Sequence, residues 1–208
     1  ARADAMIIIN EYYQPPYAKT IQPVQSRHVH GRPKVSGRGL DGKTFIFEAH
    51  NIEYRIYNDD DGIFNGSDEY AMKAASLDRL GSQQYIAVHV KTLNVPLVTT
   101  VDYLGFRVLC VAKVPSKRIL LNEEGEVRKI SEEMLHGLVN EGDEFYNKSA
   151  LVSRLLRTAG TRLGLCEHHV RGLRDIQSSV TAASSELKVY LGTDEEFYCK
   201  DFWRCFPS

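Results

Sequence analysis

The sequence predicts an α+β fold, with a mainly antiparallel sheet of hairpins that is packed by two or three helices. The first observation is that short apolar runs with strand-like alternation occur in pairs, and turn-forming residues separate the members of each pair. The second is that other segments repeat apolar residues at helical spacing and follow a serine or an aspartate that can cap a helix. Hairpins mixed with helices are typical of α+β domains.

Composition is that of an ordinary globular protein, with 208 residues, of which 43% are apolar and 25% charged. The net charge of −1 argues against a nucleic-acid binder that uses its whole surface, although a local basic patch stays open. No stretch approaches the roughly 18 apolar residues of a membrane span. The four cysteines form no Cys-x-x-Cys pair, so we expect reduced thiols and a cytoplasmic location.

Residues 1–43 are expected to form an extended, basic N-terminal arm that is rich in glycine and proline. Basic residues spaced by glycine can follow a phosphate backbone. The candidates for binding RNA are Arg27, Arg32, Lys34, Arg38 and Lys43. The alternative is a flexible, solvated arm, and it is favoured because no aromatic side chain lies between these charges.

The folded part is expected to be a single domain over residues 44–208. Its first three hairpins pair residues 45–47 with 52–57, 97–103 with 106–114, and 118–121 with 126–130. Leu104 and Gly105 form the turn of the second hairpin. Between the first two hairpins, Asp68 can cap a helix that runs to about Leu80, where Gly81 would end it.

Two further helices are predicted in the second half of the chain. Ser131 would cap the first, whose apolar residues lie between 134 and 139. Ser149 would cap the second, which Gly164 would end. The small, polar residues 176–186 are expected to form a mobile loop that leads to a last hairpin over residues 187–207.

Asp201, in that last hairpin, is the most informative single residue. Strand alternation would place it on the same face as Phe197 and Cys199, and a carboxylate on an apolar face needs a partner. The structural interpretation pairs Asp201 with an arginine, namely Arg171, Arg174 or Arg204.

The alternative interpretation is a divergent, kinase-like domain that binds ATP and Mg²⁺ through Asp201. The last hairpin looks like the one that presents the magnesium-binding aspartate in protein kinases, and Lys113 and Glu69 would then form the ion pair of that fold. Chain order counts against this interpretation, because the lysine strand precedes the helix in kinases whereas Lys113 follows Glu69. The structural interpretation is therefore favoured, and no catalytic residue and no cofactor is assigned.

Two groups of metal-capable side chains also occur, at residues 166–169 and at His28 and His30. The first group is bunched too tightly for all its members to reach one tetrahedral ion, and no second cluster completes either set. The sequence therefore predicts no metal site.

Three blocks of sequence resemble those of one family. Val101–Pro115 is similar to the segment of Clu-domain (clustered mitochondria) proteins in which Val-Asp-Tyr-Arg-Gly-Tyr-Arg-Val runs on to a proline. Leu151–His169 resembles a helix of these proteins, and the last hairpin resembles their closing motif. The matched motif residues are Asp102, Tyr103, Gly105, Arg107, Gly192, Asp194, Tyr198, Asp201 and Arg204. Leu104 and Glu195 depart from the pattern, which indicates a distant member.

The resemblance implies a function that composition and spacing do not reveal. It implies part of a larger cytosolic protein that is tied to mitochondrial distribution, and our first hypothesis is a non-catalytic interaction domain. The link would be an association with RNA or with ribosomes, so RNA or protein is the expected partner. The oligomeric state stays open.

Overall fold

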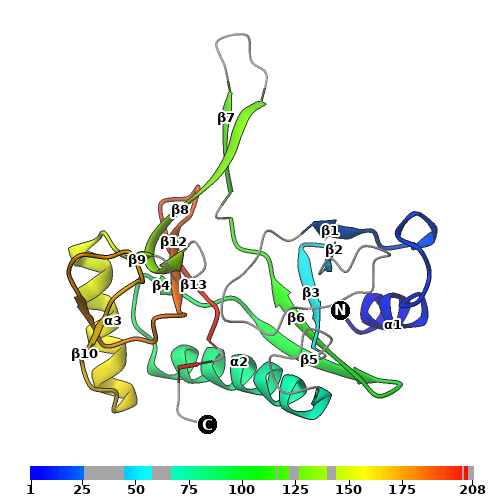
Figure 1. The fold of residues 1–208 in the computed structure, drawn as a ribbon, viewed down its shortest axis with the longest axis horizontal. Helices are drawn as coiled ribbons and strands as arrows, with labels where there is room; N and C mark the ends of the chain where they lie inside the picture. The colour runs from blue at the N-terminus through cyan, green and yellow to red at the C-terminus, as the bar shows by residue number, and fades with distance from the viewer. Residues whose placement is uncertain are drawn as a thin grey trace. The chain divides into compact units, whose positions relative to one another are not determined.

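The computed structural model describes residues 1–25, 45–57, 67–115, 117–121, 127–139, 144–202 and 204–205. It has helices and mostly antiparallel strands, which confirms the α+β class (Figure 1). The chain divides into two compact units, Ala1–Leu80 with Leu97–Lys113, and Gly81–Pro96 with Val114–Ser208. The first unit begins at residue 1, ahead of residue 44, where the folded part was expected to start.

The first unit contains a five-stranded antiparallel sheet among the described residues, with the order β1-β2-β3-β6-β5. The strands are β1 (Pro23–Gln25), β2 (Phe45–Ala49), β3 (Ile52–Ile56), β5 (Val98–Tyr103) and β6 (Phe106–Ala112). Two predicted hairpins are thereby confirmed. Leu104 and Gly105 form the β5–β6 turn with φ of 47° and 80°, as a two-residue hairpin turn requires.

Helix α1 (Arg2–Asn10) packs on this sheet and corrects the expected arm. Its Ala5, Ile8 and Ile9 are buried in the same cluster as Tyr54 and Val108. Strand β1 then pairs with β2, so residues 1–25 belong to the fold instead of extending from it. The physical reason is the apolar run at residues 5–9. The free energy gained by burying these side chains exceeds the conformational entropy lost when this short segment is ordered.

Helix α2 (Asp68–Val88) is longer than predicted, because Gly81 does not end it. A Cβ atom at Gly81 would lie 2.7 Å from both the Cβ and the carbonyl oxygen of Phe202. This glycine therefore permits close packing inside a continuous helix. The cap lies one residue earlier than predicted, since Ser67 Oγ accepts a hydrogen bond of 3.4 Å from the N–H of Tyr70.

The second unit contains a six-stranded sheet within the described part of the chain, in which β9 joins the path β4-β13-β12-β8-β7 by pairing with β8. Its strands are β4 (Leu93–Asn94), β7 (Lys117–Leu121), β8 (Val127–Val139), β9 (Glu144–Asn147), β12 (Lys188–Leu191) and β13 (Phe197–Lys200). The β4–β13 pair is parallel and the others are antiparallel. The predicted third hairpin and the last hairpin are both confirmed.

Strand β8 replaces the helix that was predicted after Ser131. It pairs with β9 through one edge and with β12 through the other, and His136 is completely buried between them. Gly137 has φ of 120° and lies against the backbone of Leu187, where a Cβ atom would be only 2.8 Å from the carbonyl oxygen. Strand pairing therefore overrides the helical spacing of the apolar residues.

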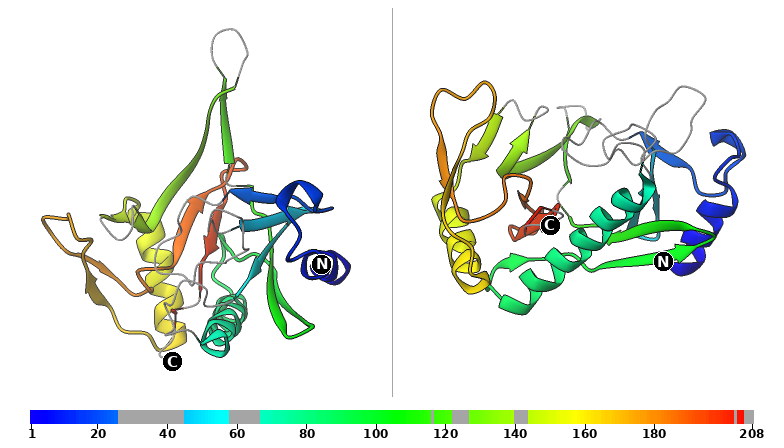
Figure 2. Two further views of the ribbon diagram at one scale, coloured as in Figure 1. Left: turned by 45° about the vertical axis from the view of Figure 1, so that its right-hand side comes forward. Right: turned by 60° about the horizontal axis from the view of Figure 1, so that its bottom comes forward.

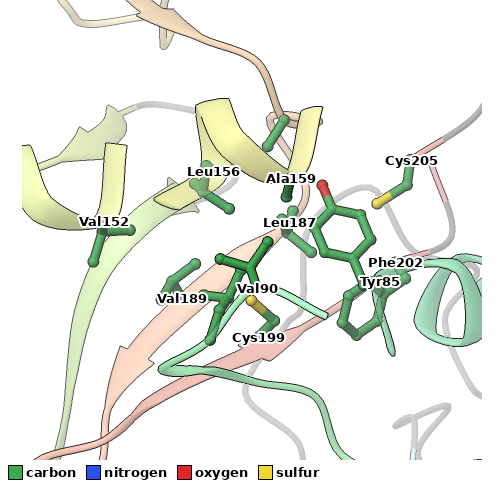
Figure 3. Packing of buried hydrophobic residues seen from close by; sticks show 12 residues of the cluster. Tyr85, Val90, Val152, Leu156, Ala159, Leu187, Val189, Cys199, Phe202 and Cys205 are labelled. Carbon is green, nitrogen blue, oxygen red and sulfur yellow. The ribbon is translucent and has the colours of Figure 1, made fainter. Parts of the chain in front are cut away.

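Helix α3 (Ala150–Leu163) is confirmed at both ends. Ser149 Oγ accepts a hydrogen bond of 3.3 Å from the N–H of Val152, and Gly164 ends the helix with φ of 72°. The helix covers β12 and β13 (Figure 3). The labelled residues of this core are Tyr85, Val90, Val152, Leu156, Ala159, Leu187, Val189, Cys199, Phe202 and Cys205.

A hairpin formed by β10 (His168–Val170) and β11 (Ser179–Thr181) replaces much of the expected mobile loop. Ala182 and Ala183 follow it and are buried. Gly160 of α3 lets Ala182 approach, because a Cβ atom at Gly160 would lie 2.7 Å from that of Ala182. No helix in the described ranges combines the length and the hydropathy that crossing a membrane requires.

Candidate functional site

The turn of the last hairpin is built by three of the motif residues. Tyr198 donates a hydrogen bond of 2.6 Å from its hydroxyl to Asp194 Oδ2, and Asp194 Oδ1 accepts one of 3.3 Å from the N–H of Glu196. A Cβ atom at Gly192 would meet the Asp194 carboxylate and would lie 2.7 Å from the Tyr198 ring. The hydrogen bond lowers the pKa of Asp194 and raises that of Tyr198 to about 12.

Asp201 follows β13 in a left-handed conformation, with φ of 71°, and its side chain is buried. The alternation expected from Phe197 and Cys199 therefore does not extend to it, because the strand ends at Lys200. The Nζ atom of Lys188, on β12, lies 3.4 Å from Asp201 Oδ2.

One cation beside Asp201 is thus Lys188, a lysine that the sequence analysis did not consider. Lys188 pairs in register with Lys200, which places it next to Asp201, so the hairpin register could have identified it. Arg204, the arginine nearest in sequence, lies 3.6 Å from Glu186. A buried pair of this kind specifies a structure more than it stabilises it.

The motif of the β5–β6 hairpin also forms protein contacts. Arg107 binds both carboxylate oxygens of Asp102, at 2.7 Å each, directly across the two strands. Its third nitrogen donates a hydrogen bond of 2.8 Å to Ser76 Oγ on α2. The Tyr103 hydroxyl donates one of 3.3 Å to Oδ1 of Asn10, the last residue of α1. This hairpin therefore connects the sheet to α1 and to the first half of α2.

Lys113 and Glu69 do not form the ion pair that the kinase-like interpretation requires. Lys113 Nζ lies 2.5 Å from Glu48 Oε2, because β6 ends beside β3 and the β2–β3 turn. Glu69 is exposed in the first turn of α2 and pairs with Lys73, one turn along the same helix, at 2.9 Å. Lys113 therefore pairs with a carboxylate of the adjacent hairpin, and Glu69 pairs with a lysine of its own helix.

The groups considered for metal binding have other contacts or lie outside the described residues. His168 Nδ1 lies 3.2 Å from the carbonyl oxygen of Cys166, and His169 Nδ1 lies 3.1 Å from Ser178 Oγ. Within the described ranges, no three His, Cys, Asp or Glu side chains are grouped as metal ligands. His28 and His30 lie in residues 26–44, outside those ranges.

The basic RNA-binding candidates also lie outside the described residues, namely Arg27, Arg32, Lys34, Arg38 and Lys43. The segment before them, residues 11–20, is described, and we call it the aromatic loop. Its Tyr13 and Tyr17 are 77% and 85% exposed. Aromatic side chains on the surface beside a basic segment are typical of proteins that bind single-stranded nucleic acid.

Polar contacts fix the conformation of the aromatic loop. The buried ammonium group of Lys19 donates hydrogen bonds to the carbonyl oxygens of Glu11 and of Tyr12, the latter at 2.8 Å. The Glu11 carboxylate accepts hydrogen bonds of 2.6 and 2.5 Å from the N–H and the hydroxyl of Thr20. Burial lowers the pKa of Lys19. The sequence showed the tyrosines and prolines of this loop, but not which rings are exposed.

His136 is a further buried polar residue that sequence reasoning missed. Its Nδ1 lies 3.0 Å from the carbonyl oxygen of Leu187, so this nitrogen carries the proton. Its Nε2 accepts from the Thr181 hydroxyl at 3.0 Å, and that hydroxyl accepts from the N–H of Ala183 at 3.1 Å. Burial lowers the pKa of His136 to about 4. The neutral ring therefore connects β8 and β11 to Leu187, the residue before β12.

Comparison with known proteins gives a consistent result. The model of the family described as "Clustered mitochondria" matches residues 1–208. A clustered mitochondria protein homolog of Debaryomyces hansenii is 26% identical over 165 residues, and the protein clueless of Drosophila willistoni is 29% identical over 171. These matches cover 78% and 81% of this chain but only 12% and 11% of the relatives, so the chain spans about an eighth of their length. No solved structure matches.

Proposed function

Since the chain belongs to the clustered mitochondria family, we propose that it is a non-catalytic interaction domain that binds single-stranded RNA. The name of the Debaryomyces hansenii relative refers to clustered mitochondria, and both relatives are several times longer than this chain. The domain would therefore act as one part of a longer cytoplasmic protein that influences mitochondrial distribution through its RNA partner.

The observation that carries this proposal is the exposure of Tyr13 and Tyr17 on a loop of fixed conformation. Stacking of a base on an aromatic ring contributes about 1–3 kcal/mol and tolerates any sequence. The first of the basic candidates, Arg27, follows Tyr17 after nine intervening residues. The rings would stack on bases while the cations contact phosphates, which supplies the aromatic component that the basic segment itself lacks.

The contacts of the motif carboxylates support the non-catalytic part of the proposal. Asp102 is bound by Arg107, Asp194 by Tyr198, and Asp201 lies beside Lys188. In each case the partner belongs to the hairpin that carries the carboxylate. A structural role in these hairpins is therefore sufficient to explain why the three carboxylates are present.

The proposal is tested by fluorescence anisotropy with a labelled single-stranded RNA oligonucleotide. The double substitution Tyr13→Ala and Tyr17→Ala is expected to weaken binding by at least about tenfold, because two stacking surfaces are lost. The matched control is Tyr70→Ala, which removes a ring that is 55% exposed on α2. Equal affinity of the double variant and the control would reject the role of the aromatic loop.

A second variant tests the basic segment, with glutamine in place of the five candidate cations. Each phosphate contact contributes about 0.7 to the slope of log K against log salt for single strands, so the slope should fall by up to about 3.5. Deletion of residues 1–43 is unsuitable, because α1 and β1 are part of the first unit. An unchanged slope would reject phosphate binding by this segment.

A further inference from the structure

The tip of the β10–β11 hairpin, residues 171–177, exposes two aliphatic side chains that the proposed RNA site does not use. Leu173 is 82% exposed and Ile176 is 95% exposed. In both views of Figure 2 the hairpin extends from the end of α3. Isolated apolar side chains are common on protein surfaces. The backbone conformation and the charged residues around these two therefore have to show whether they form a binding site.

The hairpin tip is a fixed turn. The N–H of Asp175 donates a hydrogen bond of 3.2 Å to the carbonyl oxygen of Gly172, which closes a turn with Leu173 and Arg174 at its centre. The Asp175 carboxylate accepts hydrogen bonds of 2.7 Å from the N–H of Gly172 and 2.9 Å from that of Phe145 on β9. The turn is therefore held in a conformation that directs Leu173 to solvent.

The sequence that leads into and out of the hairpin tip has a net positive charge. From the first residue of α3 to the last of β11, residues 150–181, the chain has five arginines and two acidic residues, a net charge of +3. The whole chain, in contrast, has a net charge of −1. Arg171 and Arg174 are exposed on either side of Leu173, and Oδ2 of Asp175, the acidic residue of the tip, accepts hydrogen bonds from two backbone N–H groups.

We propose that the hairpin tip docks on a membrane surface that contains anionic lipids. Leu173 and Ile176 would enter the boundary between headgroups and acyl chains, while Arg171 and Arg174 would contact lipid phosphates. Aliphatic side chains flanked by cations are the composition that binds such an interface, since apolar burial and electrostatic attraction add together. The long arginine side chains can keep their charge at the headgroup level.

The chemistry of the hairpin tip favours lipid over two other partners. Single-stranded RNA binds through aromatic stacking, and both exposed apolar side chains of the tip are aliphatic. A stable protein interface buries roughly 800 Å² on each partner around an apolar centre, which is far more than two side chains on a turn provide. Shallow insertion into a lipid surface needs no larger patch.

The test is flotation of the 208-residue chain with vesicles. The five cations of the basic segment are replaced by glutamine throughout, so that this segment cannot bind the vesicles. Vesicles of phosphatidylcholine with about 30% phosphatidylserine are compared with vesicles of phosphatidylcholine alone. Binding is expected only to the anionic vesicles and should decrease as salt is added.

Two pairs of substitutions locate the contact. Leu173→Ser with Ile176→Ser should weaken vesicle binding by at least about tenfold, and Arg171→Gln with Arg174→Gln by about tenfold as well. The matched control, Leu97→Ser, removes a leucine that is 76% exposed in the first unit, and it should bind as the parent does. Circular dichroism verifies that each variant is folded.

Any of three results would overturn the proposal: absence of binding to anionic vesicles, equal binding by the tip variants and the control, or tip substitutions that weaken RNA binding instead. The RNA measurements use other residues, so either idea can fail without the other.

Discussion

The imidazole of His136 lies 3.0 Å from the carbonyl oxygen of Leu187, in the interior of the second unit. A carbonyl oxygen only accepts hydrogen bonds, so the proton is on Nδ1 and Nε2 is left to accept from Thr181. Strands β8 and β11 and the residue before β12 are therefore connected by a histidine that has to remain neutral.

This arrangement predicts that the free energy of unfolding decreases as the pH is lowered below about 6.5. The pKa of His136 is lowered from an ordinary 6.5 to about 4, so in this interval the unfolded chain binds a proton that the folded chain does not. The contribution of the neutral ring is complete above about pH 6.5 and is lost as the pH falls toward 4. Its loss amounts to about 1.4 kcal/mol per pH unit and about 3 kcal/mol in total.

Urea unfolding of the parent chain and of His136→Gln, at pH 7 and at pH 5, checks this prediction. Carboxylates also titrate in acid, and the comparison with the variant removes their common effect. The variant should be less stable at pH 7, because its amide cannot reproduce both hydrogen bonds, and the difference should shrink at pH 5. A difference independent of pH would contradict the assignment.

A second prediction concerns Gly81, where alanine should destabilise the protein although alanine is the better helix former. At an exposed helix position, glycine costs about 1 kcal/mol relative to alanine. At Gly81 a Cβ atom would lie 2.7 Å from the carbonyl oxygen of Phe202, so the two segments would have to separate. We expect Gly81→Ala to lower the free energy of unfolding by about 1–3 kcal/mol.

Gln84→Ala is the control for Gly81→Ala, because Gln84 is exposed on the same helix. It should leave the free energy of unfolding within about 0.5 kcal/mol of the parent value. A stabilised Gly81→Ala variant would show that the close packing on Phe202 is wrong.

The third prediction separates a structural Asp201 from one that binds metal. Asp201→Asn keeps the size of the side chain and tolerates the left-handed backbone, but it leaves Lys188 without the charge that lies 3.4 Å away. A loss of about 1–3 kcal/mol in the free energy of unfolding is expected. Lys188→Met in the same background should cost less than it does in the parent chain, because the two residues are coupled.

Thermal melting with ATP and Mg²⁺ completes the test of Asp201. A structural role predicts that the ligand leaves the midpoint of the parent chain unchanged. A midpoint that rises with ATP and Mg²⁺, and no longer rises in Asp201→Asn, would support the kinase-like alternative instead.

Local signals were sufficient for part of the fold. Leu104-Gly105 gave a hairpin turn, and Ser149 and Gly164 gave both ends of α3, because each of these residues acts on its immediate neighbours. The helix expected after Ser131 failed for the opposite reason. Its apolar residues also fit a strand, and the pairing with β9 and β12 that decides between the two comes from elsewhere in the chain.

The contacts of the candidate site were less accessible to sequence reasoning. The apolar run of α1 was overlooked beside the glycines and prolines that follow it, so the start of the fold was placed too late. Asp201 was expected to have a partner, but only arginines were considered for it, although the register of the last hairpin sets Lys188 next to it. Nothing in the sequence distinguished the buried Tyr12 from the exposed Tyr13.

Photo-crosslinking tests the proposed RNA site most directly. A single-stranded RNA that contains 4-thiouridine is bound to the 208-residue chain and irradiated, and the linked peptides are identified by mass spectrometry. The account predicts links to Tyr13 or Tyr17 and to residues 26–44. Links confined to the second unit, with none in the first 44 residues, would contradict it.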